Sequence, residues 1–193
     1  MPTATAVFVG LVVALLVQRV VELRIAKRNE AWARSQGARE YGARHYPLFF
    51  VLHGGWGAAW IVEGWLRGPS LVPGWWAWLT LFVLAQGLRY WAITTLGRRW
   101  NTRILVLPHS TPIRTGPYRF LSHPNYLAVI VELWVVPAIV GAWITAAVAS
   151  VLNLLLLLAV RIPAEERALR AAAPQQGDRR EPSSPSAERR AGR

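Results

Sequence analysis

The chain has 193 residues, of which 53% are apolar and 11 are tryptophan, and its formal net charge is +12 at pH 7. Apolar content this high excludes intrinsic disorder over most of the chain, and the absence of cysteine excludes a disulfide scaffold, a thiolate metal site and a thiol nucleophile. High charge together with high apolar content predicts alternating apolar and basic blocks. This pattern is more typical of a membrane protein than of a nucleic-acid-binding protein.

Five apolar blocks follow one another along the chain. Each is close to the ~20 residues that a helix needs to cross ~30 Å of hydrocarbon. The blocks are 3–21, 46–66, 72–96, 126–143 and 144–160. The last two almost touch, so we expect a tight helical hairpin that turns near residues 141–145. The predicted fold class is an all-α integral membrane protein with about five transmembrane helices.

The first block has the wrong charge pattern for a cleavable signal peptide. No basic residue precedes its apolar core, whereas Arg19, Arg24, Lys27 and Arg28 follow it. A signal peptide has the reverse order, with its positive charges before the apolar stretch. We therefore expect residues 3–21 to be the first membrane span.

Basic regions alternate with the apolar blocks. Residues 19–44 hold seven Arg or Lys, residues 97–122 hold five Arg, and residues 161–193 hold eight. Five crossings place all three regions on one side of the membrane, and the positive-inside bias identifies this side as the cytoplasm. We expect the N-terminus outside and the C-terminus in the cytoplasm. Topology accounts for the charge and no nucleic-acid motif accompanies it, so no nucleic-acid partner is expected.

The last residues differ in composition from the rest. Residues 171–193 are rich in proline, serine, glutamine and charge, with almost no apolar residue larger than alanine. Such a segment cannot bury enough surface to fold. We predict one membrane domain, 1–170, followed by a disordered polar tail, 171–193.

Several polar residues lie within or beside the spans. An ionisable residue at the centre of a membrane helix costs roughly 2.5–3.5 kcal/mol, so it should face protein or a water-filled cavity. Glu132 lies seven residues after Asn125, so two helical turns bring both to one face. Two interpretations stay open: a structural pair of Glu132 with Arg89 or Asn153, and a wall of a polar pocket. His53 lies among glycines, where we expect close packing rather than a ligand.

About 30 residues separate the third and fourth spans, and a structured loop of that length is usually functional. Pro124 suits the first turn of the following helix, where a missing N–H costs nothing. His123 and Tyr126 are three residues apart and should share one edge of that helix. First-turn N–H groups also favour an anion such as a carboxylate. A capped helix start and a ligand site both fit these residues.

The fifth span ends in the segment Arg161-Ile-Pro-Ala-Glu165-Glu166. Arg161 and Glu165 are four residues apart and should face the same way. Pro163 followed by two carboxylates is typical of a helix N-terminus. A plain interfacial pair fits this pattern, but the hairpin returns the segment to the membrane face that holds His123 and Tyr126, which favours a functional site.

These two segments together resemble the isoprenylcysteine carboxyl methyltransferase family. The resemblance is carried by Gly116-Pro-Tyr118, by His123-Pro-Asn-Tyr126 and by Arg161-Ile-Pro-Ala-Glu165-Glu166. The stretches 22–29, 89–93, 96–104 and 161–166 look like one bacterial branch of the family, whose members are often associated with type III polyketide synthases.

The resemblance implies that S-adenosylmethionine binds at the cytoplasmic face without a metal ion. Arg161 would face the acceptor as a catalytic residue, and His123 is a candidate general base. Glu132 is expected on the substrate side. The residues implied to surround the cofactor are Ser110, Thr111, Pro112, Ile113, Tyr118, His123, Pro124, Asn125, Tyr126, Glu165 and Glu166.

The activity implied is O-methylation of a lipophilic acceptor, an alkylpyrone or alkylresorcinol whose tail enters from the bilayer lipids. Carboxyl methylation of an isoprenylated cysteine is the alternative in the same class, because a carboxylate and a phenolate both suit Arg161. A non-catalytic membrane scaffold or binding protein is the alternative in another class. The sequence predicts no oligomeric state.

Overall fold

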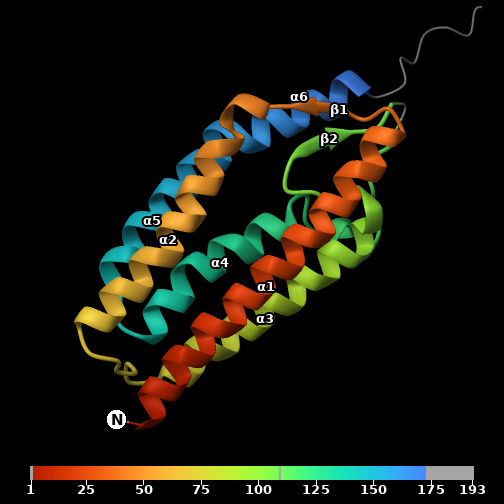
Figure 1. The fold of residues 1–193 in the computed structure, drawn as a ribbon. Coiled ribbons are helices and arrows are strands. Elements are labelled where there is room, and N and C mark those ends of the chain that lie inside the picture. Colours follow the sequence, from red (N-terminus) through yellow and green to blue (C-terminus); the bar gives the residue numbers. More distant parts are fainter. Residues whose placement is uncertain (1, 109, 173–193) are drawn as a thin grey trace, which may run out of the picture.

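The computed structural model describes residues 2–108 and 110–172, which form a helical bundle with one small sheet (Figure 1). A π-helical turn, Leu157–Arg161, joins the last two helices, so residues 143–172 form one continuous rod. Of the predicted polar tail, residues 171 and 172 belong to this rod, and 173–193 lie outside the described residues. The helices are α1 (Pro2–Ser35), α2 (Tyr46–Leu66), α3 (Trp75–Leu96), α4 (Pro124–Ile139), α5 (Trp143–Leu156) and α6 (Ile162–Ala172).

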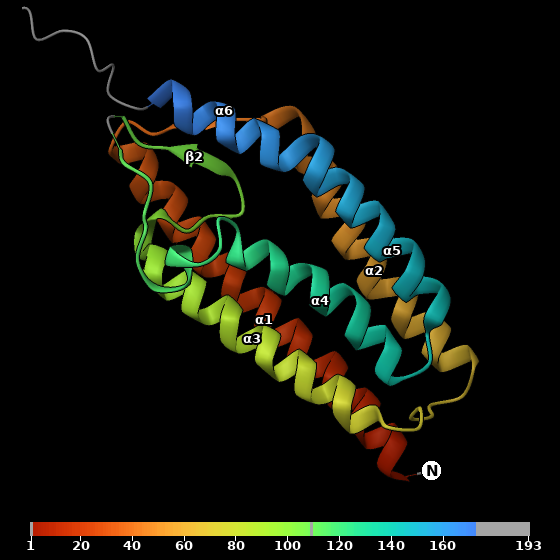
Figure 2. The same ribbon diagram turned by 180° about the vertical axis from the view of Figure 1, so that it is seen from behind.

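Helix α4 lies at the centre of the bundle, between the α1 and α3 pair and the α2 and α5 pair (Figures 1 and 2). Its side chains are the most thoroughly buried, with Leu133, Val136 and Ile139 fully enclosed. Aromatic packing joins α1 to α2, because Phe8 meets Trp60 edge-on at 5.6 Å between ring centroids. The chain's N-terminus and the α4–α5 turn lie at one end of the bundle, and β1, β2 and α6 lie at the other.

The outside of the bundle is apolar. Among its large exposed side chains are Leu16, Phe50, Val51 and Leu155. Two helical segments of the described chain, Thr3–Ser35 and Trp143–Ala172, are long and apolar enough to cross a membrane. An apolar surface of this extent is a liability in water and is suited to lipid.

Two features differ from the prediction, which was an all-α fold with a basic loop at residues 19–44. Helix α1 continues to Ser35, since residues 22–35 contain no glycine or proline and include an i,i+4 pair, Glu30–Arg34. The strands β1 (Arg39–Tyr41) and β2 (Ile104–Val106) pair antiparallel. Strands of three residues are too short to give a periodic signal, so the sequence does not reveal them.

The predicted hairpin is confirmed. Helix α4 ends at Ile139, α5 begins at Trp143, and Gly141 takes a left-handed conformation (φ +71°) between them. Glu63 of α2 caps the second helix, because its carboxylate accepts hydrogen bonds from the backbone N–H groups of Ile144 and Thr145 at 3.2 and 2.9 Å. This cap fixes the hairpin against α2.

Four charged side chains form an ion cluster, which we define as Arg19, Glu22, Arg89 and Glu132, and all but the partly exposed Arg19 are buried. Glu132 is fully buried, pairs with Arg89 at 2.9 Å and with Arg19, and accepts a hydrogen bond from Gln86. Glu22 lies 3.2 Å from Arg89 and 2.7 Å from Arg19. Of the two interpretations left open for Glu132, the structure shows the ion pair with Arg89. The cluster joins α1, α3 and α4 with balanced charge.

Candidate functional site

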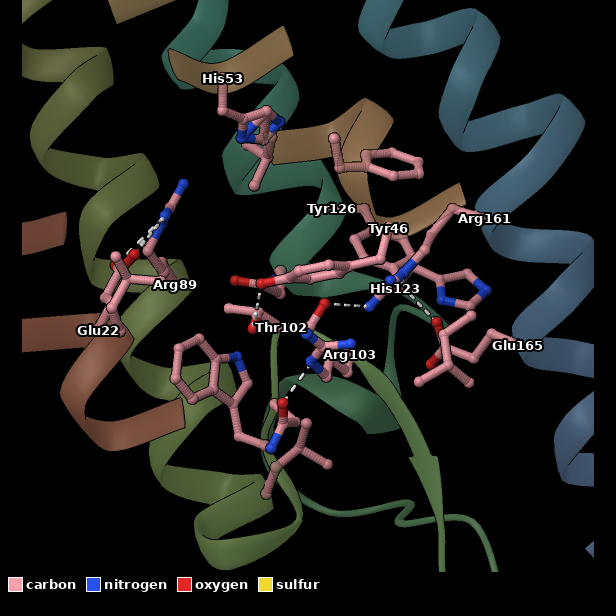
Figure 3. Close-up of a pocket in the computed structure, with 18 of the residues that line it drawn as sticks. Glu22, Tyr46, His53, Arg89, Thr102, Arg103, His123, Tyr126, Arg161 and Glu165 are labelled. Atoms are coloured by element: carbon pink, nitrogen blue, oxygen red, sulfur yellow. Dashed lines mark hydrogen bonds and ion pairs between the residues drawn. The ribbon is translucent and has the colours of Figure 1, made fainter. Parts of the chain in front are cut away.

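A cavity of about 660 Å³ opens among the helices and the loop that precedes α4, a volume typical of small-molecule sites. Figure 3 shows His123, Tyr126, Arg161 and Glu165 together on one side of it, and Glu22 and Arg89 on the other. Its far end is apolar. The lining there includes Val12, Leu15, Trp56, Trp60 and Ile61.

The Tyr126 hydroxyl is the centre of the polar end. It donates a hydrogen bond to the Glu165 carboxylate and accepts one from Arg161 Nε at 3.1 Å. Arg161 Nη2 donates a second bond to the Thr102 carbonyl at 2.9 Å. The predicted Arg161 and Glu165 pair therefore meets through the Tyr126 hydroxyl. Residues from three distant parts of the chain, 102, 126 and 161–165, thus form one hydrogen-bonded network.

Arg161 owes its position to the π-helical turn that it closes. Pro163 has no N–H to donate to the carbonyl of Ala159, and its ring crowds that carbonyl in regular α-helix geometry. A π turn is a recognised accommodation and is frequent at functional sites. Pro163 thus lies in the first turn of α6, but that helix continues the rod without a break. The sequence pattern predicts a free helix N-terminus at this position instead. The guanidinium-bearing Arg161 is only 8% exposed.

The start of α4 holds the aromatic part of the site. Pro124 occupies the first turn as predicted, and His123 precedes it. The His123 and Tyr126 rings stack at 5.1 Å with 12° between their planes, which confirms that they share one edge. Burial, and then the Glu165 carboxylate, raise the pKa of Tyr118 above its ordinary value. Its hydroxyl is therefore protonated at neutral pH.

Gly116 allows the loop to approach α3. Its backbone is left-handed (φ +54°), and a Cβ at this position would overlap Thr95 Oγ1. A short 3₁₀ helix, Gly116–Arg119, starts there and carries Tyr118 to the cavity. Only glycine meets both the conformational and the steric requirement.

Ion pairs hold the rim of the cavity beside β1 and β2. Arg103 donates to Glu40 at 2.6 Å, and Arg34 pairs with the same carboxylate. Burial acts to raise the pKa of Glu40, but the hydrogen bonds from Arg103 and Arg34 bring that pKa below its ordinary value. The Arg103 guanidinium also lies 4.2 Å from the centre of the Tyr46 ring. These contacts attach the sheet to α1 and α2.

The structure brings most of the predicted site residues together. Those that line the cavity are Ser110, Thr111, Pro112, Ile113, Tyr118, His123, Asn125, Tyr126, Arg161 and Glu165. Three others lie outside the lining. Pro124 is buried in the first turn of α4, and Glu166 is exposed and pairs with Arg170 at 3.1 Å. Glu132 reaches the cavity only through Arg19 and Arg89, which do line it.

Sequence reasoning missed several lining residues. Thr102 contributes a backbone carbonyl, for which no side-chain signal exists. The centre of the Phe49 ring lies 5.7 Å from Arg161 Cζ, with the guanidinium over the ring face. His53 and Asn153 line the cavity with 3.4 Å between Nε2 and Oδ1, although close packing was expected for His53. Their polarity within apolar spans was the signal that could have found them.

The polar end is rich in hydrogen-bond acceptors. Asn125 Oδ1 is buried without a partner among the described residues, and Asn125 lines the cavity. Together with the Glu165 carboxylate it suits a ligand that carries amino and hydroxyl donors. In residues 2–108 and 110–172, no group of three His, Cys, Asp or Glu side chains is arranged to hold a metal ion.

Comparisons with known proteins find a matching family and two bacterial relatives. Residues 78–171 match the isoprenylcysteine carboxyl methyltransferase family. The chain is 40% identical over 162 residues to the uncharacterized protein YpbQ of Bacillus subtilis, covering 82% of this chain and 94% of that protein. It is 31% identical over 156 residues to an uncharacterized protein of Haemophilus influenzae, covering 80% and 90% respectively. No solved structure matches the chain.

Proposed function

Since the chain belongs to the isoprenylcysteine carboxyl methyltransferase family of membrane proteins, we propose that its cavity is the site of methyl transfer from S-adenosylmethionine to a lipophilic acceptor. One observation carries the proposal: the Tyr126 hydroxyl joins Arg161 to Glu165 at the polar end of a cavity whose other end is apolar. Polar and apolar compartments in one cavity suit a water-soluble donor and a lipid-soluble acceptor.

The residues of the polar end fit this cofactor. S-adenosylmethionine supplies an electrophilic methyl group on a sulfonium centre. Asn125 Oδ1, which is buried and has no partner in the described part of the chain, would accept from an amino group, and the Glu165 carboxylate from ribose hydroxyls or the amino group. A carboxylate beside the sulfonium would stabilise the ground state more than the transition state, because that positive charge disappears during transfer. Glu165 is therefore assigned to the cofactor's polar periphery.

The remaining predicted cofactor residues form the walls. Residues 110–113 pass along the cavity, and the stacked rings of His123 and Tyr126 offer an aromatic flank. Pro124 acts by starting the helix that holds these rings. Glu166, exposed and outside the lining, is left out of the proposed site.

Arg161 is assigned to the acceptor. Its buried guanidinium is held by Tyr126 and by the Thr102 carbonyl, so its position is fixed before the acceptor binds. A fixed cation beside the attacking oxygen stabilises an oxyanion at little reorganisation cost, and alignment of the reacting atoms lowers the barrier further. His123 is the candidate general base.

The proposed acceptor is an alkylpyrone or alkylresorcinol, methylated on oxygen. A phenol or enol ionises readily enough for Arg161 to stabilise its anion, and the apolar end of the cavity would take the tail. The carboxylate of an isoprenylated cysteine is the alternative, because the same Arg161 suits it. Incubation of purified protein with labelled S-adenosylmethionine and each of alkylresorcinol, alkylpyrone and farnesylcysteine identifies the acceptor. A non-catalytic scaffold would show no saturable cofactor binding.

The five-span topology is tested with reporters. Helices α1 to α4 and the α5–α6 rod alternate in direction, and the basic regions meet at the β1–β2 end, which we assign to the cytoplasm. A reporter fused after Arg193 is expected to read cytoplasmic, and one fused before Met1 to read external. A periplasmic or external reading for the C-terminal fusion would contradict the five-span arrangement.

Glu165→Gln tests the cofactor site. The substitution keeps the side-chain shape but removes the charge that strengthens hydrogen bonds to the ligand. We expect the Kd for S-adenosylmethionine, measured by calorimetry in detergent, to rise roughly tenfold or more. Glu166→Gln is the matched control on the same turn, and its Kd should equal that of the unaltered protein. Equal affinity in both variants would remove Glu165 from the site.

A further inference from the structure

A second polar site lies part of the way along the cavity, away from the Tyr126 hydroxyl. It consists of His53 from α2 and Asn153 from α5, with His53 Nε2 3.4 Å from Asn153 Oδ1. Asn153 is 1% exposed and lines the cavity, and its Nδ2 has no hydrogen-bond partner in the part of the chain that the structure describes. A buried amide N–H without a partner is unfavourable, so a group that pairs with it is expected.

The order of residues along the helices gives the depth of this site. Asn153 precedes Arg161 by eight residues on one continuous rod, which corresponds to about 12 Å along its axis. Along α2, Phe49 lies beside Arg161, His53 lies one turn further, and Trp60 lies in the apolar end of the cavity. The His53 and Asn153 site therefore separates the polar end of the cavity from the apolar end.

The chemistry of this site favours a hydrogen-bond acceptor. When His53 Nε2–H donates to Asn153 Oδ1, the amide is oriented with both Nδ2 hydrogens free. Arg19 and Arg89 line the same cavity, and Arg89 Nε is also buried without a hydrogen-bond partner among the described residues. A plain hydrocarbon tail would leave these donors unpaired, whereas an oxygen in the tail would accept from them.

We propose that Asn153 Nδ2, oriented by His53, binds an oxygen atom carried on the chain of the lipophilic substrate, about 12 Å from the oxygen that receives the methyl group. The inference rests on the proposed function and specifies its acceptor. The substrate class is an alkylpyrone or alkylresorcinol whose chain carries a carbonyl, ether or hydroxyl oxygen, rather than an acceptor with an unsubstituted alkyl tail or an isoprenoid tail.

Two matched probes test the inference. One is a resorcinol with a plain pentadecyl tail, and the other carries a ketone in that tail about 12 Å from the ring oxygen. Binding to the purified full chain in detergent is followed by tryptophan fluorescence, since Trp56 and Trp60 line the cavity. We expect the ketone probe to bind the unaltered protein about tenfold more tightly, as one hydrogen bond provides.

Asn153→Leu should abolish this preference by weakening the ketone probe alone. Ser150→Ala is the matched control and should keep the preference. Ser150 lies on the same helix outside the cavity lining, and its buried hydroxyl has no hydrogen-bond partner among the described residues. The inference is overturned if the unaltered protein binds both probes equally. Binding of S-adenosylmethionine is measured in parallel: its absence would refute the proposed function, whereas equal probe affinities with normal cofactor binding would refute only the chain-oxygen site.

Discussion

Glu132→Ala is expected to lower the free energy of unfolding by about 3–5 kcal/mol, because it leaves the buried Arg89 and the partly exposed Arg19 with one carboxylate between them. Glu132 is fully buried and pairs with both Arg19 and Arg89. Glu22 remains as the only carboxylate of the ion cluster for two guanidinium groups, and Arg89 is nearly as buried as Glu132. The substitution also opens a void at the centre of α4, which adds to the cost.

The measurement is thermal and denaturant unfolding of the purified protein in detergent. Glu30→Ala is the control, because Glu30 forms an exposed pair with Arg34 that should contribute about 0–1 kcal/mol. The double variant Glu132→Leu with Arg89→Met should recover part of the lost stability, since it removes a charge of each sign together. Equal stability of the Glu132 and Glu30 variants would show that the cluster does not stabilise the fold.

Arg161→Ala is expected to reduce kcat/KM for methyl transfer by about 100- to 1000-fold, the range found when a fixed oxyanion donor is removed. The guanidinium is held by Tyr126 and the Thr102 carbonyl beside the polar end of the cavity. Because the acceptor, and not the cofactor, is assigned to Arg161, the Kd for S-adenosylmethionine should change by less than about threefold.

Two variants sharpen this test. Arg167→Ala removes a cation about one and two-thirds turns further along the same rod, where its side chain is exposed and donates to the Pro163 carbonyl. Its turnover should be normal. Arg161→Lys keeps the charge but loses the fork that contacts Tyr126 and Thr102 together, so an intermediate rate is expected. Normal turnover in Arg161→Ala would exclude this residue from the reaction.

Features that depend on one segment agreed with their sequence patterns. The block 46–66 has the bounds of α2, the hairpin turns where Gly141 permits a left-handed residue, and Pro124 occupies the first turn of α4. His123 and Tyr126 stack because residues three apart share a helix edge. In each case, hydrophobicity, local backbone preference or helical period acts within a few residues, so the feature can be predicted from that segment of the sequence alone.

Predictions of features that depend on several segments of the chain were incomplete or differed from the structure. The pattern after Arg161 suggested a new helix, whereas packing keeps one rod and inserts a π turn before Pro163. Glu132 fitted both a structural pair and a pocket wall, and the approach of α1 and α3 places it in the ion cluster. Neither the pairing of β1 with β2 nor the role of the Thr102 carbonyl has a local signature.

The sequence by itself determined the approximate positions of the apolar helices and the two segments that carry the resemblance to the family. Burial in lipid and helical period depend on the order of side chains along the chain. Only the tertiary structure decided that Tyr126 joins Arg161 to Glu165, and that His53 meets Asn153 within the cavity. These contacts join helices far apart in sequence, and their geometry follows from how the helices pack rather than from any local pattern.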